Sequence, residues 1–296
     1  MTATLGIALG SGGARGWCHI GVLRSLAAQG AVPDCVAGCS MGALVGAAWA
    51  AGKLDGLETW ARGLTQARLL HYLDPRMDRG GLIAGAAVTR VLQELGLPER
   101  IEDLPKPLLV VATDMATGRE VWLREGPLIP AVRASISIPG VFAPQRLDGR
   151  WLLDGGLINP VPTSAVRALG ARRTIAVNPN AKHGRKLWEG QPPQDVWQRF
   201  GVEDWRAGLP EPLRAMLPEG RREAVPAYME VVSVSIDILT EFLRKAREAV
   251  DPADVMLEAD LLELSVMELF RAAEAIDEGA RIAQAAAGRI AALITA

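Results

Sequence analysis

Two glycine-rich turns, each placed between a short apolar strand and an apolar helix, constrain the fold of this chain most strongly. The first turn covers residues 10–16 and follows the apolar segment 3–9. The second turn is centred on Ser40 and follows the apolar segment 34–39. The order of strand, turn and helix, repeated twice, is typical of a parallel sheet covered by helices on both faces. We therefore predict an α/β fold with a mostly parallel central sheet.

The apolar patterning beyond these turns predicts further strands and helices. Strands are expected over residues 3–9, 34–39, 108–113, 120–123, 151–153, 174–178 and 253–258. Helices are expected over residues 17–29, 43–51, 86–95, 128–135, 162–169, 228–250 and 265–292. We expect these elements to form a single domain that spans residues 1–296.

The segment 180–226 differs from the rest of the chain in composition. It is rich in proline and charged residues, and it contains three tryptophans, Trp188, Trp197 and Trp205. We interpret this segment as an insertion or lid within the domain, built of short helices. The alternative is a long surface loop whose aromatic side chains pack against one another.

Composition narrows the classes of protein to which this sequence can belong. Of its 296 residues, 49% are hydrophobic and 22% are charged, which is ordinary for a globular protein and excludes wholesale disorder. The net charge of −2 argues against binding to nucleic acid, which favours a basic surface. The longest apolar stretch, residues 41–52, is too short to cross a bilayer, and the N-terminal residues lack the pattern of a signal peptide.

The three cysteines, Cys18, Cys35 and Cys39, have neither the number nor the spacing of a disulfide framework or a zinc site. This cysteine usage fits a reducing compartment. We therefore expect a soluble, cytoplasmic protein that can make peripheral contact with a membrane surface, and we expect it to need neither a metal nor a cofactor.

Residues 38–42 spell G-x-S-x-G, with Ser40 at the centre. Between a strand and a helix, this pattern indicates a nucleophile elbow, a strained turn that projects the serine hydroxyl at the carboxyl end of the sheet. The glycines on both sides remove Cβ atoms that would clash, and the helix that follows points its positive end at a developing anion. The alternative is a tight turn in which Ser40 caps the helix. Cys39 is a rival nucleophile, but we expect its side chain to point away from the tip of the elbow.

The first glycine turn, Gly-Ser-Gly-Gly-Ala-Arg-Gly over residues 10–16, admits two interpretations. A dinucleotide-binding fingerprint would need glycine where Arg15 stands and an acidic residue after the second strand, where Ser40 stands. The other interpretation is an oxyanion hole, in which consecutive glycine amides converge and Arg15 adds positive charge. We favour the oxyanion hole, because the two turns would then lie side by side above neighbouring strands.

A serine nucleophile needs a base, and the chain has only three histidines, His19, His71 and His183. His183 lies in a charged segment that indicates a solvated surface. His19 lies one turn into the first helix, where a packing role is expected, and we have no role for His71. A conventional triad through His183 or His19 is kept as an alternative.

Asp154 is the better candidate for the base. It directly follows a short apolar strand, and Gly155 and Gly156 permit close approach to another element. A free aspartate is a weak base for serine, with a pKa of about 3.9, but burial raises that pKa and a hydrogen-bonded contact removes the need for a free encounter. The alternative is a turn in which Asp154 caps the strand.

Four blocks in this order make the chain similar to the patatin-like phospholipases, in particular to their compact bacterial branch. The blocks are residues 10–16, 38–42, 134–139 (Ala-Ser-Ile-Ser-Ile-Pro) and 154–156 (Asp-Gly-Gly). The resemblance runs to about Asn178, and residues 253–279 also fit the bacterial branch.

This resemblance implies a three-layer α/β/α fold and hydrolysis of lipid acyl esters, so that the partner is a lipid or fatty-acyl ester substrate. It implies a dyad of Ser40 and Asp154 without histidine. The residues that it implies for the oxyanion hole are Gly12 and Gly13 as donors, with Ala14 and Arg15 nearby. Ser11 stands where many members have a third glycine, although its amide can still donate. An alternative from another class is a non-catalytic lipid-binding or regulatory protein on the same fold.

Overall fold

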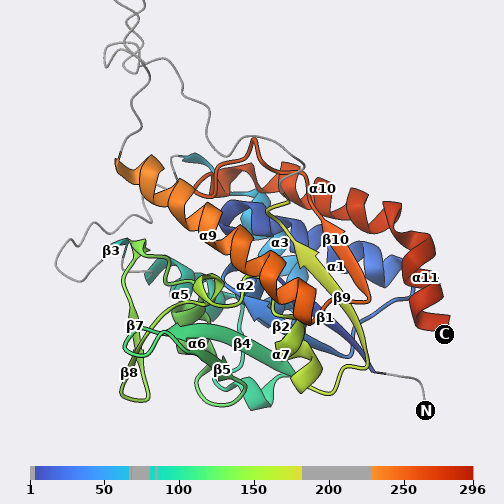
Figure 1. Cartoon of the computed structure of the whole chain (residues 1–296), viewed down its shortest axis with the longest axis horizontal. Coiled ribbons are helices and arrows are strands. Elements are labelled where there is room, and N and C mark those ends of the chain that lie inside the picture. Colours follow the sequence, from blue (N-terminus) through green and yellow to red (C-terminus); the bar gives the residue numbers. More distant parts are fainter. Residues whose placement is uncertain (1–3, 67, 69–80, 84–85, 182–227, 296) are drawn as a thin grey trace, which may run out of the picture. The chain divides into compact units, whose positions relative to one another are not determined.

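The computed structural model contains an eight-stranded sheet with helices on both faces (Figure 1), described for residues 4–66, 68, 81–83, 86–181 and 228–295. The strands are β1 Leu5–Leu9, β2 Cys35–Cys39, β3 Gly81–Ile83, β4 Leu108–Asp114, β5 Glu120–Leu123, β6 Gly140–Phe142, β7 Gln145–Leu147, β8 Arg150–Asp154, β9 Arg173–Asn178 and β10 Val255–Glu258. The α-helices are α1 Cys18–Ala28, α2 Met41–Ala50, α3 Leu54–Arg62, α5 Ala86–Glu94, α6 Leu128–Ser135, α7 Thr163–Ala168, α9 Tyr228–Val250, α10 Ala272–Ala285 and α11 Ala287–Thr295. Short 3-10 helices are η1 Gly13–Trp17, η3 Ile101–Asp103, η4 Gly155–Leu157 and η6 Leu269–Arg271.

The main sheet has the strand order β10-β9-β1-β2-β4-β8-β7, with β5 paired to β4 as well. Strands β10, β9, β1, β2 and β4 run parallel to one another. Strands β5 and β8 run antiparallel to β4, and β7 runs antiparallel to β8. Strands β3 and β6 form a separate parallel pair. The prediction of an α/β fold with a mostly parallel central sheet is confirmed.

The C-terminal part of the chain differs from the single helix predicted over 265–292. Two α-helices, α10 and α11, stand there instead, and they are separated by a turn at Ala286. Ile282 of α10 and Ile290 of α11 are both buried in the core, and the turn lets each helix present its own apolar face there. The short elements α3, β3, β6 and β7 were not predicted.

Two compact units divide the chain, Met1–His183 together with Leu239–Ala296, and Gly184–Ile238. The described part of the second unit is the N-terminal half of α9. The insertion or lid expected over 180–226 lies outside the described residues except for Asn180 and Ala181. That interpretation and the single domain over 1–296 stay predictions.

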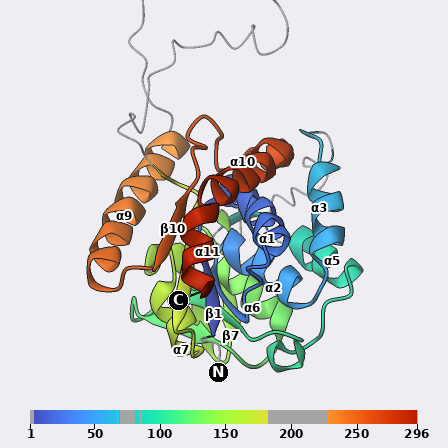
Figure 2. The same ribbon diagram turned by 90° about the vertical axis from the view of Figure 1, so that its right-hand side faces the viewer.

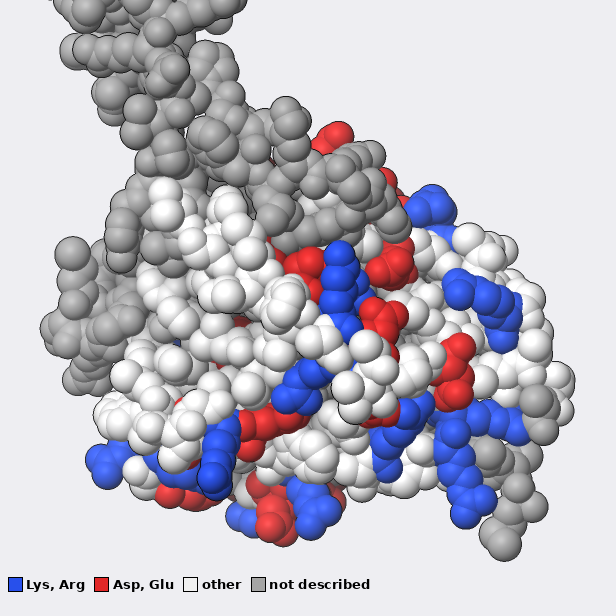
Figure 3. All heavy atoms as spheres, in the orientation of Figure 1, with Lys and Arg blue, Asp and Glu red and all other residues white. Residues whose placement is uncertain are grey.

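Charged side chains of both signs are interspersed over the right-hand and lower parts of the face seen in Figure 3. Ion pairs among the described residues include Arg247 of α9 with Glu120 of β5 at 2.9 Å and Arg244 with Glu241 at 2.9 Å. This mixing of signs accords with the small net charge of −2. Within the described ranges, no helix has both the length and the apolar character needed to cross a bilayer.

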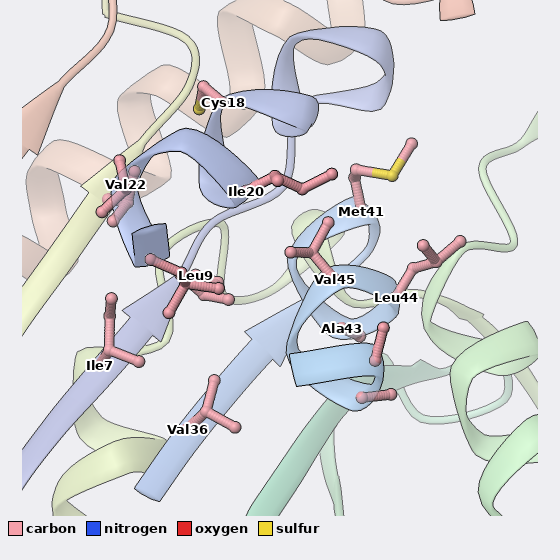
Figure 4. Close-up of a cluster of buried hydrophobic side chains, with 14 of the residues drawn as sticks. Ile7, Leu9, Cys18, Ile20, Val22, Val36, Met41, Ala43, Leu44 and Val45 are labelled. Carbon is pink, nitrogen blue, oxygen red and sulfur yellow. The ribbon is translucent and has the colours of Figure 1, made fainter. Parts of the chain in front are cut away.

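The side chains of β1 and β2 alternate between the two faces of the sheet, and each face is covered by different helices. Ile7, Leu9 and Val36 pack with α1 and α2 in the larger core cluster (Figure 4). Ala8 and Ala37 point to the opposite face, where α7 packs. Because successive strand side chains alternate between faces, this pattern fixes which face each helix covers. Figure 2 shows α7 across the strands from α1 and α2.

Candidate active site

The ends of β2 and β8 meet on one edge of β4. On β4, residues 108–111 pair with β2, residues 110–113 with β5, and residues 112–114 with β8. A strand has only two edges, and β5 overlaps in register with both other partners, so β2 and β8 share the edge opposite β5. Strand β2 stops opposite Val111, and Asp154 at the end of β8 lies opposite Ala112. Ser40, the first residue after β2, therefore meets Asp154.

The side chains of Ser40 and Asp154 form a hydrogen-bonded pair. Ser40 Oγ donates to Asp154 Oδ2 at 2.6 Å, and both residues are buried. The other carboxylate oxygen, Oδ1, accepts the amide of Gly156 at 2.7 Å. The carboxylate therefore caps its own turn with one oxygen and binds the serine hydroxyl with the other, so the capping role and the contact with Ser40 occur together.

Ser40 occupies a strained elbow between β2 and α2. Its φ of 54° and ψ of −123° lie in a region that non-glycine residues rarely adopt. The glycine two residues later is required by packing, because a Cβ on Gly42 would lie 2.1 Å from the carbonyl oxygen of Leu9. The Ser40 side chain makes no capping hydrogen bond to α2. The alternative in which Ser40 is a side-chain cap is therefore not realised.

Burial sets the acid–base character of the site. It raises the pKa of Asp154 to about 7, although the hydrogen bonds from Ser40 and Gly156 act to lower it. A carboxyl group with this pKa can accept a proton near neutral pH. Burial, with Asp154 nearby, raises the pKa of the Cys39 thiol well above its usual range. Cys39 is fully buried in the core cluster on the α7 face, so it is a poor candidate nucleophile.

The first glycine turn lies against the elbow. A Cβ on Gly16 would lie 2.5 Å from the Cβ of Met41, the first residue of α2. A Cβ on Gly156 would lie 2.8 Å from the Ser11 hydroxyl oxygen. The two turns and the Asp154 turn are thus in mutual contact at the carboxyl ends of β1 and β2.

The amides of the first glycine turn are not equally open to an anion. Those of Ser11, Ala14 and Arg15 donate to the carbonyl oxygens of Pro160, Val266 and Gly12 respectively, at 2.8, 2.9 and 3.1 Å. Within the described part of the chain, no acceptor binds the amides of Gly12 and Gly13. Among the described residues, the two expected donors, the amides of Gly12 and Gly13, are therefore left without a protein acceptor, and the composition of the oxyanion hole stays a prediction.

The Arg15 side chain stabilises the backbone of the first glycine turn through hydrogen bonds. It is buried, with Nε donating to the carbonyl oxygen of Leu264 at 2.8 Å and a terminal nitrogen donating to Asn180 Oδ1 at 3.1 Å. Asn180 in turn donates to the carbonyl oxygen of Ser11 at 2.7 Å. The Arg15 guanidinium therefore stabilises the backbone of the turn through Leu264 and Asn180, and it contributes positive charge there.

His19 forms a hydrogen bond with the first glycine turn and none with Ser40. Its Nε2 donates to the carbonyl oxygen of Gly10 at 2.8 Å, and burial lowers its pKa to about 4, so the ring is neutral. Among the described residues, no imidazole bonds Ser40 or Asp154, and no three His, Cys, Asp or Glu side chains gather as metal ligands would. His71 and His183 lie outside the described residues.

Two buried hydroxyl residues at the site had no predicted role. Ser135 Oγ accepts the amide of Ser40 at 2.8 Å and donates to the Val111 carbonyl oxygen at 2.6 Å. Thr113 Oγ1 donates to the carbonyl oxygen of Asp154 at 2.8 Å. The signal for Ser135 was present in the block 134–139, whereas nothing in the sequence marks Thr113.

Comparison with known proteins gives a consistent family match. A family model described as patatin-like phospholipase matches residues 7–167. An uncharacterized NTE family protein of Mycobacterium tuberculosis is 44% identical over 186 residues, covering 63% of this chain and 52% of that protein. The human patatin-like phospholipase domain-containing protein 6 is 34% identical over 182 residues, covering 59% of this chain and 13% of that protein. The chain thus spans about half the length of the first relative and a smaller share of the second.

Among solved structures, VipD from Legionella pneumophila aligns with 99% of this chain and 67% of its own chain. The TM-score is 0.43 and the sequence identity is 14%. Because this likeness is low, the family match rests on the sequence comparisons.

Proposed function

Because the chain belongs to the patatin-like phospholipase family, we propose that it is a serine acyl hydrolase, a phospholipase or esterase that cleaves carboxylic esters of lipids. The observation that carries the proposal is the 2.6 Å hydrogen bond from Ser40 Oγ to Asp154 Oδ2 between two buried side chains. Fold alone does not specify a function, so the proposal depends on this pair and on the open amides beside it.

In the first step, the Asp154 carboxylate accepts the proton of the Ser40 hydroxyl as its oxygen attacks the ester carbonyl carbon. The carbonyl oxygen becomes an oxyanion, which the amides of Gly12 and Gly13 stabilise. Collapse of this intermediate breaks the ester bond, and the alcohol leaves with the proton held by Asp154. The acyl group then remains on Ser40.

In the second step, a water molecule gives its proton to Asp154 and attacks the acyl-enzyme carbonyl. A second oxyanion forms against the same amides and collapses. The fatty acid leaves, and Ser40 regains its proton from Asp154. The positive end of α2, which begins at Met41, further stabilises negative charge near Ser40.

The proposed substrate is a lipid or fatty-acyl ester, since both active-site turns are flanked by apolar segments. Nucleic acid is not a proposed partner. Peripheral contact with a membrane and a cytoplasmic location stay predictions.

Hydrolysis of p-nitrophenyl acyl esters and of phospholipid vesicles tests the proposal. We expect wild-type turnover, and a loss of about 1000-fold or more in kcat in both Ser40→Ala and Asp154→Asn. His183→Ala should retain activity, because the dyad needs no imidazole. If the wild type binds lipid without turning it over, and Ser40→Ala binds equally well, the protein is a lipid-binding module and the proposal is wrong.

A further inference from the structure

The hydrogen-bond ladder between β2 and β4 stops one bond short of its natural end. In this parallel pair the amide of Val36 donates to the carbonyl oxygen of Pro107 at 3.0 Å, in the register that pairs Cys39 with Val111. Because such bonds repeat at every second residue, the amide of Ser40 would next donate to the Val111 carbonyl oxygen. In the structure, the hydroxyl of Ser135 stands between these two groups.

The Ser135 hydroxyl replaces one ladder bond with two bonds in series. Ser40 N–H donates to Ser135 Oγ at 2.8 Å, and Ser135 Oγ–H donates to Val111 at 2.6 Å. The Ser40 amide is therefore held about one oxygen atom farther from β4 than a ladder partner would be. This displacement coincides with the departure of the chain from the sheet, at the residue with φ 54°.

The residues at the C-terminal end of α6 also bind the backbone of Asp154, the hydrogen-bond partner of Ser40. The amide of Asp154 donates to the carbonyl oxygen of Ser137 at 3.0 Å. Ser137 is fixed in turn by its hydroxyl, which donates to the Arg133 carbonyl oxygen at 2.8 Å, and both serines are fully buried. Ser135 and Ser137 therefore connect the backbones of Ser40 and Asp154 through two residues of one rigid segment.

We propose that Ser135 is a positioning residue, whose hydroxyl keeps the β2–β4 ladder open at Ser40 and thereby sets the contact between Ser40 Oγ and Asp154 Oδ2. This inference rests on the proposed function for its kinetic consequence, but its structural consequence is independent of turnover. Ser135 touches no reacting atom, so it acts through the backbone of Ser40.

Removal of the hydroxyl leaves two buried groups without their bridge. In Ser135→Ala, we expect the Ser40 amide and the Val111 carbonyl to recover a partner by closing on each other as a ladder bond. That movement draws the elbow toward β4 and changes the geometry between Ser40 Oγ and the carboxylate. A displacement of about 1 Å in a catalytic group is enough to lower a rate by roughly 100-fold.

Thr174 on β9 provides a matched control. Its hydroxyl is also fully buried and also both donates and accepts, binding Asp254 Oδ2 at 2.8 Å and the Asp254 amide at 3.1 Å. It pairs in register with Gly6, near the start of β1 and away from the carboxyl ends of the strands. Thr174→Val therefore removes a comparable pair of hydrogen bonds, and a longer third one from Arg167 at 3.4 Å, without touching the elbow.

The kinetic experiment compares Ser135→Ala, Thr174→Val and wild type on a p-nitrophenyl ester at a temperature where all three are folded. We expect kcat to fall by at least about tenfold in Ser135→Ala with little change in KM, and to stay at the wild-type value in Thr174→Val. Wild-type kcat in Ser135→Ala, or an equal loss in Thr174→Val, overturns the proposal. If Ser135→Ala does not fold, Ser135→Cys takes its place with the same criteria, since the thiol keeps the volume but bonds weakly.

A second readout separates this inference from the proposed function. The pKa of Asp154 is measured by carbon NMR in wild type, Ser40→Ala and Ser135→Ala. Because the hydrogen bond from Ser40 lowers this pKa, we expect it to rise in both variants. An unchanged pKa in Ser135→Ala overturns the positioning role. Lack of turnover in the wild type would overturn the proposed function alone.

Discussion

At the scale of single residues, the Asp154 carboxyl combines two opposed requirements. Catalysis needs the ionised form, but the site is buried and burial favours the protonated form. The hydrogen bonds from Ser40 and Gly156 favour the anion and act to lower the pKa of Asp154. The result is a pKa of about 7, which suits a base at neutral pH.

The first prediction concerns the pH dependence of the rate. Since Asp154 must be ionised to accept the serine proton, kcat/KM for an uncharged ester should rise with pH through about 7 and then level off. Titration of His19 cannot cause this rise in kcat/KM, because burial lowers the pKa of His19 to about 4. A rate that is constant from about pH 5 to about pH 8 would contradict a base of this kind.

The second prediction concerns stability. The folded-state pKa of Asp154, about 7, is above the unfolded value of about 3.9, so its stabilising contribution is complete below about pH 4 and is lost as the pH rises through 7. Asp154→Asn keeps a donor and an acceptor at the two oxygen positions and cannot ionise. As the pH rises from about 4 to about 8, the free energy of unfolding of Asp154→Asn minus that of wild type should therefore increase by roughly 4 kcal/mol.

Urea denaturation of both proteins at the two pH values measures this difference. If the difference in free energy of unfolding between Asp154→Asn and wild type is the same at both pH values, burial does not raise the pKa of Asp154.

At the scale of helices and strands, a reciprocal pair of glycines fixes how α1 and α10 cross. A Cβ on Gly21 would lie 1.9 Å from the Ile276 carbonyl oxygen, and a Cβ on Gly279 would lie 1.9 Å from that of Cys18. The two helix backbones therefore touch directly at this point. Because α1 follows η1, the crossing also anchors the first glycine turn to the C-terminal part of the chain.

The third prediction tests this crossing. Gly21→Ala should lower the free energy of unfolding by about 2 kcal/mol or more, because the added methyl group overlaps backbone atoms that cannot move independently. Gly288→Ala in α11 is the control, since no atom lies within 4 Å of the added carbon. It should be neutral or stabilise by up to about 1 kcal/mol, as expected for alanine in a helix. Equal denaturation midpoints for the two variants would refute the close crossing.

Local sequence patterns were sufficient to predict the elements that carry the site, but not all of their neighbours. The strands before the two glycine turns are short and apolar, and their turn residues are distinctive, so β1, β2 and α2 could be predicted. The separation of α10 from α11 at Ala286 could not, because the segment 283–287 is rich in alanine and gives no helix-stop signal. Strands β6 and β7, three residues each, are too short to show a period.

At the scale of the whole molecule, the contact of Ser40 with Asp154 spans 114 positions in the sequence. Apolar patterning predicts a strand before Asp154 but does not say with which strand it pairs or in which direction. The contact depends on β8 running antiparallel along the edge of β4 that β2 leaves empty beyond Val111. Local features make Asp154 a candidate base for Ser40, and the family resemblance implies the two residues as a dyad, but neither predicts the strand pairing that brings them into contact.

The whole fold also decides which amides of the first turn stay open. The amide of Ser11 donates to Pro160, which lies between η4 and α7, and the amide of Ala14 donates to Val266, which lies after β10. The local sequence of residues 10–16 does not show that Val266 binds the Ala14 amide or that Pro160 binds the Ser11 amide. Which amides of this turn lack a protein acceptor is therefore a property of the assembled fold, whereas the role of Gly12 and Gly13 as oxyanion donors stays a prediction.

The reactivity of Ser40 toward a fluorophosphonate, with the modified residue mapped by mass spectrometry, tests the central claim most directly. The account predicts that Ser40 alone is labelled in the wild type, that Ser40→Ala is not labelled, and that Asp154→Asn reacts at least about 100-fold more slowly. A label on any other residue, or labelling of Asp154→Asn at the wild-type rate, would contradict it.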